Sequence, residues 1–498
     1  MQGTAKKIIY VCLVFLAVSF GACQKISNDG TGHIKRLEIF SISPTKVLSH
    51  LPFLLKVTGQ GFDKNSMIVF YGSEVPTDNV APGELIAEIP ADMVSFPLDQ
   101  PDLNVAVWVV AKDPSTGNTL TESSHLYLLV RSMPEFSEPR SIYQIRAEYD
   151  NIYNCKLLID TNDIFYLVWK EVAWWLDGSE VTKLGISTDG GQTWNTAREI
   201  PPHESFFARE GKLFAFPGED NVTLDAQLKY YYSSDGGSSW ETGIVGSLDQ
   251  EKEFGGYKVC MDANGKFTLV YGQVGADGFV RLTTLVSPDS GGTWEVKGES
   301  VTPADMGIDW LYGFHLHWLT ANTAGGVTLG CTYDSIIPNA ESRVYMSTDG
   351  GAGFLEFTGG LSERNILYFY GGYLSEQGTL YTVYCDNEYY RVYNTAFFRG
   401  ENFGSQTAKL QVFSSAPGRG SMVINKDEQL YILSGAFIMR SVDKGDGWTE
   451  PTDLSAYIDG LWVDYHSMAM DGSQKLYIIG ENGRDILMVQ SGQPENEE

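Results

Sequence analysis

The chain has 498 residues, of which 43% are hydrophobic and 20% are charged, a composition typical of a globular protein with material for more than one core. Its 63 acidic residues against 35 basic ones give a formal net charge of -28, which argues against a nucleic-acid partner because phosphate would be repelled. The 53 glycines and the 13% of aromatic residues favour short strands and tight turns over helices.

The N-terminus has the features of an export signal. Two lysines precede an apolar run, Ile8 to Phe20, which is too short to span a bilayer as a permanent helix. The run ends in FGAC, which resembles a bacterial lipobox, and the resemblance implies lipid on Cys23. We therefore predict a signal peptide over 1–22 and a lipidated polar linker over 23–32. The protein is expected at the bacterial outer membrane, facing the exterior, with the lipid as its only association with the membrane.

Four further cysteines lie far apart in the chain and form no CxxC, so the sequence has no zinc or thioredoxin signature. Each falls in an apolar, strand-like run, which favours buried free thiols, although an exported protein could also pair them. The four are Cys155, Cys260, Cys331 and Cys385.

Residues 33–130 alternate short apolar runs with turns rich in Gly, Pro, Asn and Asp, which is typical of an all-β domain. The stretches SISP at 41–44, VTGQGF at 57–62 and IVFYG at 68–72 resemble the IPT/TIG family of immunoglobulin-like modules. The resemblance covers nearly the whole segment. It implies a β-sandwich that serves as a spacer or binding module and carries no catalytic residue.

Five octets of one pattern recur between residues 187 and 448. Each begins with Ser, has Asp at its third position and ends in Trp or Phe. The carboxylate can accept backbone N–H groups, glycine takes the positive-φ position, and the aromatic ring plugs the gap beneath the turn. The octets resemble the Asp-boxes of bacterial neuraminidase (BNR) repeats, which implies a sialidase-like β-propeller. The resemblance makes the acids of the boxes structural: Asp189, Asp235, Asp289, Asp349 and Asp443.

The spacing of the boxes predicts the number of blades. The box acids lie 46, 54, 60 and 94 residues apart, so the last gap holds two units, with a degenerate box expected over 394–403. Strand-like runs also divide 131–490 into seven units, the last of which lacks a strand. Residues 140–149 could supply it and close the ring. We predict a seven-bladed propeller over 131–490 and a polar tail over 491–498, with six blades, the number in sialidases, as the alternative.

In the propellers that this sequence resembles, the first strand of each blade begins at the ligand face and the Asp-boxes lie at the other face. This implies a rim of strand starts and loops where aromatic rings could stack on sugars and polar groups could bind hydroxyls. The candidate rim residues are Trp174, Trp175, His203, Tyr257, Trp310, His315, His317, Arg419, Trp462 and His466. The tandem tryptophans could instead pack against a neighbouring blade, and the histidines could line a central channel.

No metal or cofactor is predicted, because nothing in the spacing of the histidines supports a metal site. A sialidase needs three arginines, a Tyr nucleophile with a Glu partner and an Asp acid/base, and its family carries an Arg-Ile-Pro motif. That motif is absent, the nearest piece being QIR at 144–146, so no catalytic residue is assigned. The sequence favours a surface lipoprotein that binds glycans or mediates adhesion, as a monomer or within an outer-membrane uptake complex. The alternative is an exo-acting glycosidase of sialidase type.

Overall fold

The computed structural model describes the chain from residue 36 to residue 492 in eighteen segments. These are 36–96, 102–134, 136–145, 151–173, 179–195, 197–218, 227–249, 252–275, 279–301, 314–333, 341–357, 366–387, 393–401, 405–413, 420–425, 427–454, 464–482 and 484–492. Their regular structure is β-strand apart from one short 3-10 helix, Ala91–Val94, which confirms the all-β class. Among these segments no helix is long and apolar enough to cross a membrane. The chain divides into two compact units, with the division between Val130 and Arg131.

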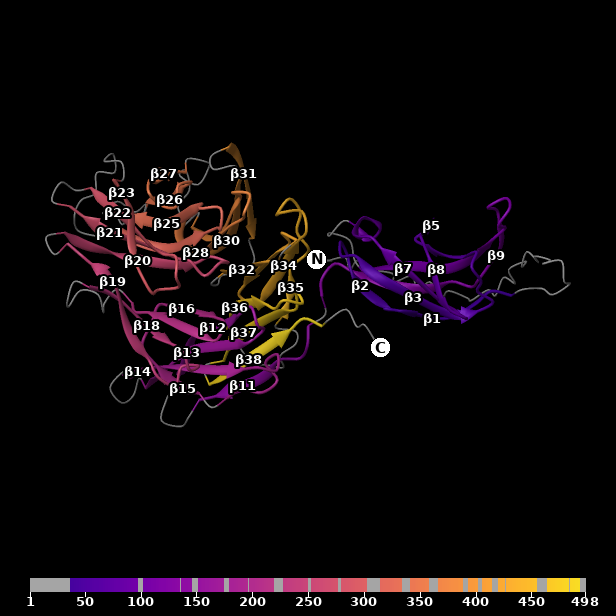
Figure 1. Ribbon diagram of the computed structural model, residues 1–498, viewed down its shortest axis with the longest axis horizontal. Helices are drawn as coiled ribbons and strands as arrows, with labels where there is room; N and C mark the ends of the chain where they lie inside the picture. The colour runs from indigo at the N-terminus through magenta and orange to yellow at the C-terminus, as the bar shows by residue number, and fades with distance from the viewer. Residues whose placement is uncertain are drawn as a thin grey trace, which may run out of the picture. The chain divides into compact units, whose positions relative to one another are not determined.

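The N-terminal unit, indigo to violet in Figure 1, is a sandwich of two antiparallel sheets. One sheet has the order β1-β3-β7-β6, and the other has the order β2-β10-β8-β4-β5 with β9 paired to β8. Alternate residues of the strands face the core, where Leu55, Val57, Ile68 and Phe70 are fully buried. The strands are β1 (Glu38–Ser43), β2 (Lys46–Leu48), β3 (Phe53–Gln60), β4 (Ser66–Phe70), β5 (Ser73–Glu74), β6 (Asp78–Ala81), β7 (Glu84–Ile89), β8 (Leu103–Lys112), β9 (Thr119–Glu122) and β10 (Leu126–Arg131).

The C-terminal unit is a propeller of seven four-stranded antiparallel blades, which confirms the predicted number. The innermost strands contact one another in succession and close a ring. Blades 1 to 3 are β12 (Asn151–Ile159), β13 (Phe165–Ala173), β14 (Ser179–Ser187), β15 (Arg198–Ile200); β16 (Ser205–Arg209), β17 (Lys212–Phe216), β18 (Gln227–Ser233), β19 (Glu241–Ser247); and β20 (Glu253–Met261), β21 (Phe267–Val274), β22 (Val280–Ser287), β23 (Glu295–Val301).

The remaining blades follow the same order from the centre outward. Blades 4 to 6 are β24 (Phe314–Ala321), β25 (Val327–Tyr333), β26 (Glu341–Ser347), β27 (Leu355–Glu356); β28 (Ile366–Leu374), β29 (Leu380–Asn387), β30 (Tyr393–Glu401), β31 (Ser405–Phe413); and β32 (Gly420–Ile424), β33 (Leu430–Ser434), β34 (Phe437–Ser441), β35 (Thr452–Asp453). Blade 7 is β36 (Asp464–Met470), β37 (Leu476–Glu481), β38 (Asp485–Gln490) and β11 (Arg140–Gln144). In blade 5, β30 occupies most of 394–403, so the expected degenerate box is replaced there by strand.

The ring is closed by a strand from the start of the unit. β11 pairs with β38, with Arg140 opposite Met488 and Gln144 opposite Asp485. This confirms that residues within 140–149 complete the last blade. Phe136 extends the contact by bridging to Ser491.

The register gives every blade two distinct ends. In blade 1, Tyr153 near the start of β12 lies opposite Lys170, whereas Phe165 lies opposite both Ile159 and Ser187 at the other end. Ser187 opens the first Asp-box. We call these two ends the strand-start end and the box end.

Apolar side chains fill the seams between blades. Between blades 2 and 3, Phe216 and Tyr230 meet Phe267 and Trp294, with the rings of Phe267 and Trp294 stacked at 6.1 Å. The aromatic residue of a box therefore packs against the preceding blade and contributes to the core. Cys155, Cys260 and Cys331 are buried and free, as predicted; the side chain of Cys385 lies outside the described part of the chain.

Candidate functional site

At the box end, the five boxes share one set of hydrogen bonds. In blade 2, Ser233 Oγ donates to Asp235 Oδ1 at 2.8 Å and accepts from Gly237 N at 2.8 Å. The carboxylate of Asp235 also accepts from Ser239 N at 2.9 Å. The Ser–Asp and Ser–Gly bonds recur in the other four boxes. Bonds from Ser239 hold the pKa of Asp235 well below its usual range, so each acid is engaged by its own turn.

The box glycines are fixed by backbone conformation and by contact with the preceding blade. Gly236 and Gly237 both have positive φ, 66° and 81°. A Cβ on Gly237 would lie 2.8 Å from Leu184 Cδ2, which belongs to blade 1. The first of the two positions has room for a Cβ, at ordinary contact distance from Ile186, and other boxes have Ser290 and Lys444 there, at φ 56° and 61°. Only the second position requires glycine for its space as well as its φ.

At the strand-start end, blade 1 presents a Tyr–Glu–Lys group. The Tyr153 hydroxyl donates to Glu180, and Lys170 Nζ lies 3.0 Å from Glu180 Oε2 and 5.8 Å from the centre of the Tyr153 ring. The hydrogen bond from Tyr153 lowers the pKa of Glu180, with Lys170 adding to the effect. Burial, together with the Glu180 charge, raises the pKa of Tyr153, so the phenol keeps its proton at neutral pH.

Blades 2 and 3 are joined at this end by an ion pair between Glu204 and Lys258. Beside Glu204, His203 Nδ1 lies 3.2 Å from the carbonyl oxygen of Pro201. Burial, with the charges of Lys156 and Lys170 adding to its effect, lowers the pKa of His203 to about 4. The imidazole is therefore neutral at physiological pH.

Blade 4 adds two histidines on alternate positions of β24. His315 is exposed, and His317 Nε2 lies 2.7 Å from Thr332 Oγ1. Burial lowers the pKa of His317 to about 4, with contributions from Lys258 and His315. Lys258 therefore acts on side chains of both neighbouring blades.

These side chains come from four consecutive blades at the strand-start end: the Glu204–Lys258 ion pair joins blades 2 and 3, and the charges of Lys170 and Lys258 act on histidines of the neighbouring blades. We call the following residues the mouth cluster: Tyr153, Lys170, Glu180, His203, Glu204, Lys258, His315 and His317. The described side chains contain no group of three or more His, Cys, Asp or Glu able to hold a metal ion. Charged, hydroxyl and imidazole groups therefore provide the chemistry of this surface: donors and acceptors around an opening.

The structure describes only part of the predicted rim. It places the side chains of His203, His315 and His317 in the mouth cluster. Trp174, Trp175, Trp310, Arg419 and Trp462 lie outside the described residues, as does Cys23, and for His466 only the backbone of β36 is described.

Tyr257 differs from the prediction. It is 4% exposed, its hydroxyl donates to the carbonyl oxygen of Pro217, and its ring belongs to the seam between blades 2 and 3. A bulge between Phe254 and Tyr257 breaks the alternation of β20 and turns the ring inward.

Two further members, Tyr153 and Glu204, lie at strand starts, where the rim was predicted, whereas Lys170, Glu180 and Lys258 were not expected from the sequence. Lys170 and Glu180 lie on the second and third strands of blade 1, and only the register brings them to Tyr153. Lys258 lies on a first strand, one residue after Tyr257, so its position near a strand start was the one available signal.

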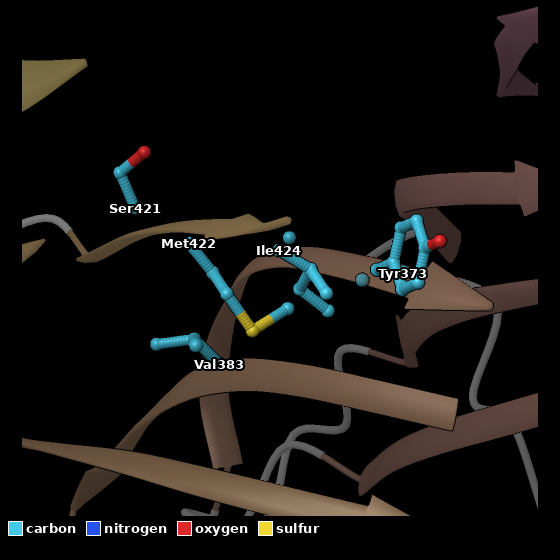
Figure 2. Close-up of a pocket in the computed structure, with 7 residues that line it drawn as sticks. Tyr373, Val383, Ser421, Met422 and Ile424 are labelled. Carbon is cyan, nitrogen blue, oxygen red and sulfur yellow. The ribbon is translucent and has the colours of Figure 1, made fainter. Parts of the chain in front are cut away.

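Two cavities lie away from this cluster. One, of about 200 Å³, lies between blades 5 and 6, where Gly371 and Gly372 leave space beside Val383 and Met422. Figure 2 shows the Met422 side chain extending toward Val383, with Tyr373 at the other end. Its walls are mainly apolar, and it is a packing gap between inner strands. The other cavity, of about 270 Å³, lies between blades 7 and 1.

No protein-family model matches the sequence, and no curated protein matches it. Among solved structures, an α-L-arabinanase from Penicillium chrysogenum, in complex with arabinobiose, is 13% identical, with 72% of this chain and 99% of that chain covered and a TM-score of 0.39. YCF48 from Cyanidioschyzon merolae is 14% identical, with 71% and 99% covered and a TM-score of 0.42. A Hadza microbial sialidase is 14% identical, with 82% and 77% covered and a TM-score of 0.40. TM-scores below 0.5 carry no argument about what this chain binds or does, so the functional question rests on its own residues.

Proposed function

We propose that this chain is a surface lipoprotein whose propeller binds glycans at the strand-start end. The observation that carries the proposal is the mouth cluster, in which four consecutive blades contribute hydroxyl, carboxylate, ammonium and imidazole groups to one opening. At the box end of the same blades, the boxes repeat one turn in which the Ser hydroxyl accepts from the backbone N–H of the second glycine position.

The chemistry of the mouth cluster suits sugar hydroxyls. A hydroxyl both donates and accepts, so it is best bound where donors and acceptors alternate. His203 and His317 are neutral, and each neutral imidazole offers one donor and one acceptor. The partly buried ring of Tyr153 adds an apolar face for a C–H surface.

The location of the protein belongs to the same proposal. Lipid on Cys23 would hold the chain at the bacterial outer membrane, and the N-terminal sandwich, read as an IPT/TIG module, would act as a spacer. A Cys23→Ser chain is expected to leave the membrane fraction and keep its fold by circular dichroism. Membrane partition equal to that of the native chain would contradict the anchor.

One observation favours the second candidate function, an exo-acting glycosidase of sialidase type. Tyr153 and Glu180 form the Tyr–Glu pair that a sialidase nucleophile requires. The cation beside the pair is Lys170, and a single ammonium cannot clamp a carboxylate as an arginine cluster does. Glycan binding without turnover is therefore the main proposal.

The test uses the soluble chain from Gln24 onward. A glycan array identifies a ligand, and calorimetry then compares the native chain with His315→Ala. Loss of one hydrogen-bonding group is expected to weaken binding about 3- to 10-fold. The matched control is Lys212→Ala, an exposed residue at the box end of blade 2, which is expected to change nothing.

Two outcomes decide between the hypotheses. An equal loss of glycan affinity in His315→Ala and Lys212→Ala would show that the mouth cluster is not the binding site. Hydrolysis of a fluorogenic sialoside that disappears in Tyr153→Phe would favour the glycosidase instead.

A further inference from the structure

The seam between blades 7 and 1 contains an aromatic pocket of about 270 Å³. β11 of blade 7 forms one wall, and strands and the box of blade 1 form the other. Gln144 and Asn195 are exposed, so the pocket opens to solvent on that side. Its lining is Ile142, Tyr143, Gln144, Leu167, Trp169, Gly185, Trp194, Asn195 and Ala197.

A missing side chain explains the pocket. Gly185 lies opposite Leu167, two residues before the box serine. The residues at the same position of the other boxed blades are Tyr231, Leu285, Tyr345 and Met439, opposite Ala215, Leu269, Leu329 and Ile432. All four are buried or half-buried. Blade 1 alone among these has no side chain at this position.

Three aromatic rings surround the space. A Cβ on Gly185 would lie 3.4 Å from an atom of Trp169 and 3.4 Å from an atom of Trp194, so both indoles pack against the glycine. The rings of Tyr143 and Trp169 lie 4.5 Å apart and are tilted by 49°. A small cavity lined by several aromatic rings is the kind of site in which proteins bind organic cations.

A buried carboxylate stands behind two of these rings. Glu171 is 0% exposed, and its Oε1 accepts from Tyr143 OH at 2.6 Å and from Trp169 Nε1 at 3.0 Å. Its Oε2 has no partner among the described residues. Donation to a carboxylate makes both rings richer in electrons, and an uncompensated negative charge favours a cation nearby.

The basic groups near the pocket are already engaged. Lys183, opposite Trp169 in register, lies 2.9 Å from Glu199. Arg140 donates to the carbonyl oxygen of Gly191 in the first box. Neither forms an ion pair with Glu171 among the described contacts.

We infer that this pocket binds a small organic ammonium group, held by cation–π contact with Tyr143, Trp169 and Trp194 and by the charge of Glu171. The ammonium could come from a choline-type headgroup or from a lysine side chain. The site is separate from the mouth cluster, and the inference does not depend on glycan binding.

The experiment measures binding of choline by calorimetry to the soluble chain from Gln24 onward. The matched probe is 3,3-dimethylbutan-1-ol, which has the shape of choline without its charge. Choline is expected to bind about 10-fold more tightly than the neutral alcohol. Nα-acetyl-lysine methyl ester, as a third probe, distinguishes a lysine source from a headgroup source.

Three variants locate the site. Gly185→Leu places in blade 1 the side chain that blade 3 has at this position, and it is expected to abolish choline binding. Gly185→Ala fits the measured space and should stay within about 2-fold of the native chain. Glu171→Gln should weaken choline about 3- to 10-fold and leave the neutral probe unchanged, with the fold of each variant checked by thermal melting.

The inference fails on any of three results from folded protein: equal affinity for choline and the neutral alcohol, no detectable binding of either ammonium probe, or undiminished choline binding by Gly185→Leu. If Gly185→Leu does not fold, the selective effect of Glu171→Gln on the charged probe decides the question.

Discussion

The two ends of the propeller blades follow opposite rules. At the box end, five turns repeat the same Ser–Asp–Gly hydrogen bonds, and each carboxylate also accepts from a backbone N–H of its own turn. At the strand-start end, blades 1 to 4 contribute different groups, and the ion pair of Glu204 and Lys258 joins two of these blades. The repeated turn, whose polar groups bond within the turn, fits a structural role, and the varied groups of the other end are the basis of the proposed binding site. The predictions that follow test this contrast, beginning with the largest effect.

Gly237→Ala should destabilise the propeller most. The substitution adds left-handed strain at φ 81° and places a Cβ 2.8 Å from Leu184, which together cost about 2–5 kcal/mol. The control is Gly190→Ala, where φ is 69° but nothing lies within 4 Å of a Cβ, with a cost of about 1–2 kcal/mol. Denaturant unfolding measures both, and equal losses would show that contact with the preceding blade is not what requires the glycine.

Ser233→Ala should have the next largest effect. The substitution removes the acceptor of Gly237 N, bonded at 2.8 Å, and leaves that buried N–H without its partner. The expected cost is about 1–3 kcal/mol in the free energy of unfolding. The affinity of the folded variant for any glycan found on the array should be unchanged. A specific loss of binding would place the box end in the site.

The two half-buried histidines of the mouth cluster, His203 and His317, should make stability depend on pH. Their pKa values near 4 lie below the unfolded value of about 6.5, so between these values the unfolded chain binds more protons. Their contribution is complete above pH 6.5 and is lost as the pH falls toward 4. Each should cost at most about 2 kcal/mol between pH 7 and pH 5. His317→Gln should flatten this dependence in urea titrations, and an unchanged slope would contradict a neutral His317 in the folded protein.

Breaking the ion pair of the mouth cluster should have the smallest effect. Glu204 and Lys258 have side chains 42% and 14% exposed, and pairs of this kind contribute about 0–1 kcal/mol. Lys258→Ala should therefore leave thermal stability almost unchanged while altering ligand affinity. A loss as large as that of Ser233→Ala would mean that the two ends do not differ as described.

The parts of the fold that local chemistry determines could be predicted from sequence. The Asp-box is a contiguous octet, so the spacing of the boxes predicted the number of blades. The missing strand of the last unit indicated that residues 140–149 close the ring. The same reasoning failed at 394–403, where β30 continues, because apolar strand residues and a degenerate turn look alike without the Ser and Asp that define the box.

The candidate sites were harder to predict from the sequence, because they depend on strand register and, at Gly185, on a side chain that is absent. The group of Tyr153, Lys170 and Glu180 joins three strands, and no linear spacing encodes it. Tyr257 was misplaced because a bulge reverses the side on which it points. Gly185 marks a pocket through a side chain that it lacks, which is visible only when the register aligns it with Leu285 and Tyr345.

The strand that completes blade 7 also sets an order of events during synthesis. β11 leaves the ribosome before any of blades 1 to 6, yet its partner β38 is made more than 300 residues later. Until then the nascent chain carries an unpaired strand at each end of an open arc, and such edges invite association with other chains. Contacts this distant in sequence slow folding. A chain that stops before Asp485 would therefore be left with an open ring and two exposed edges, and we expect its yield as soluble protein to collapse even though six of its blades are complete.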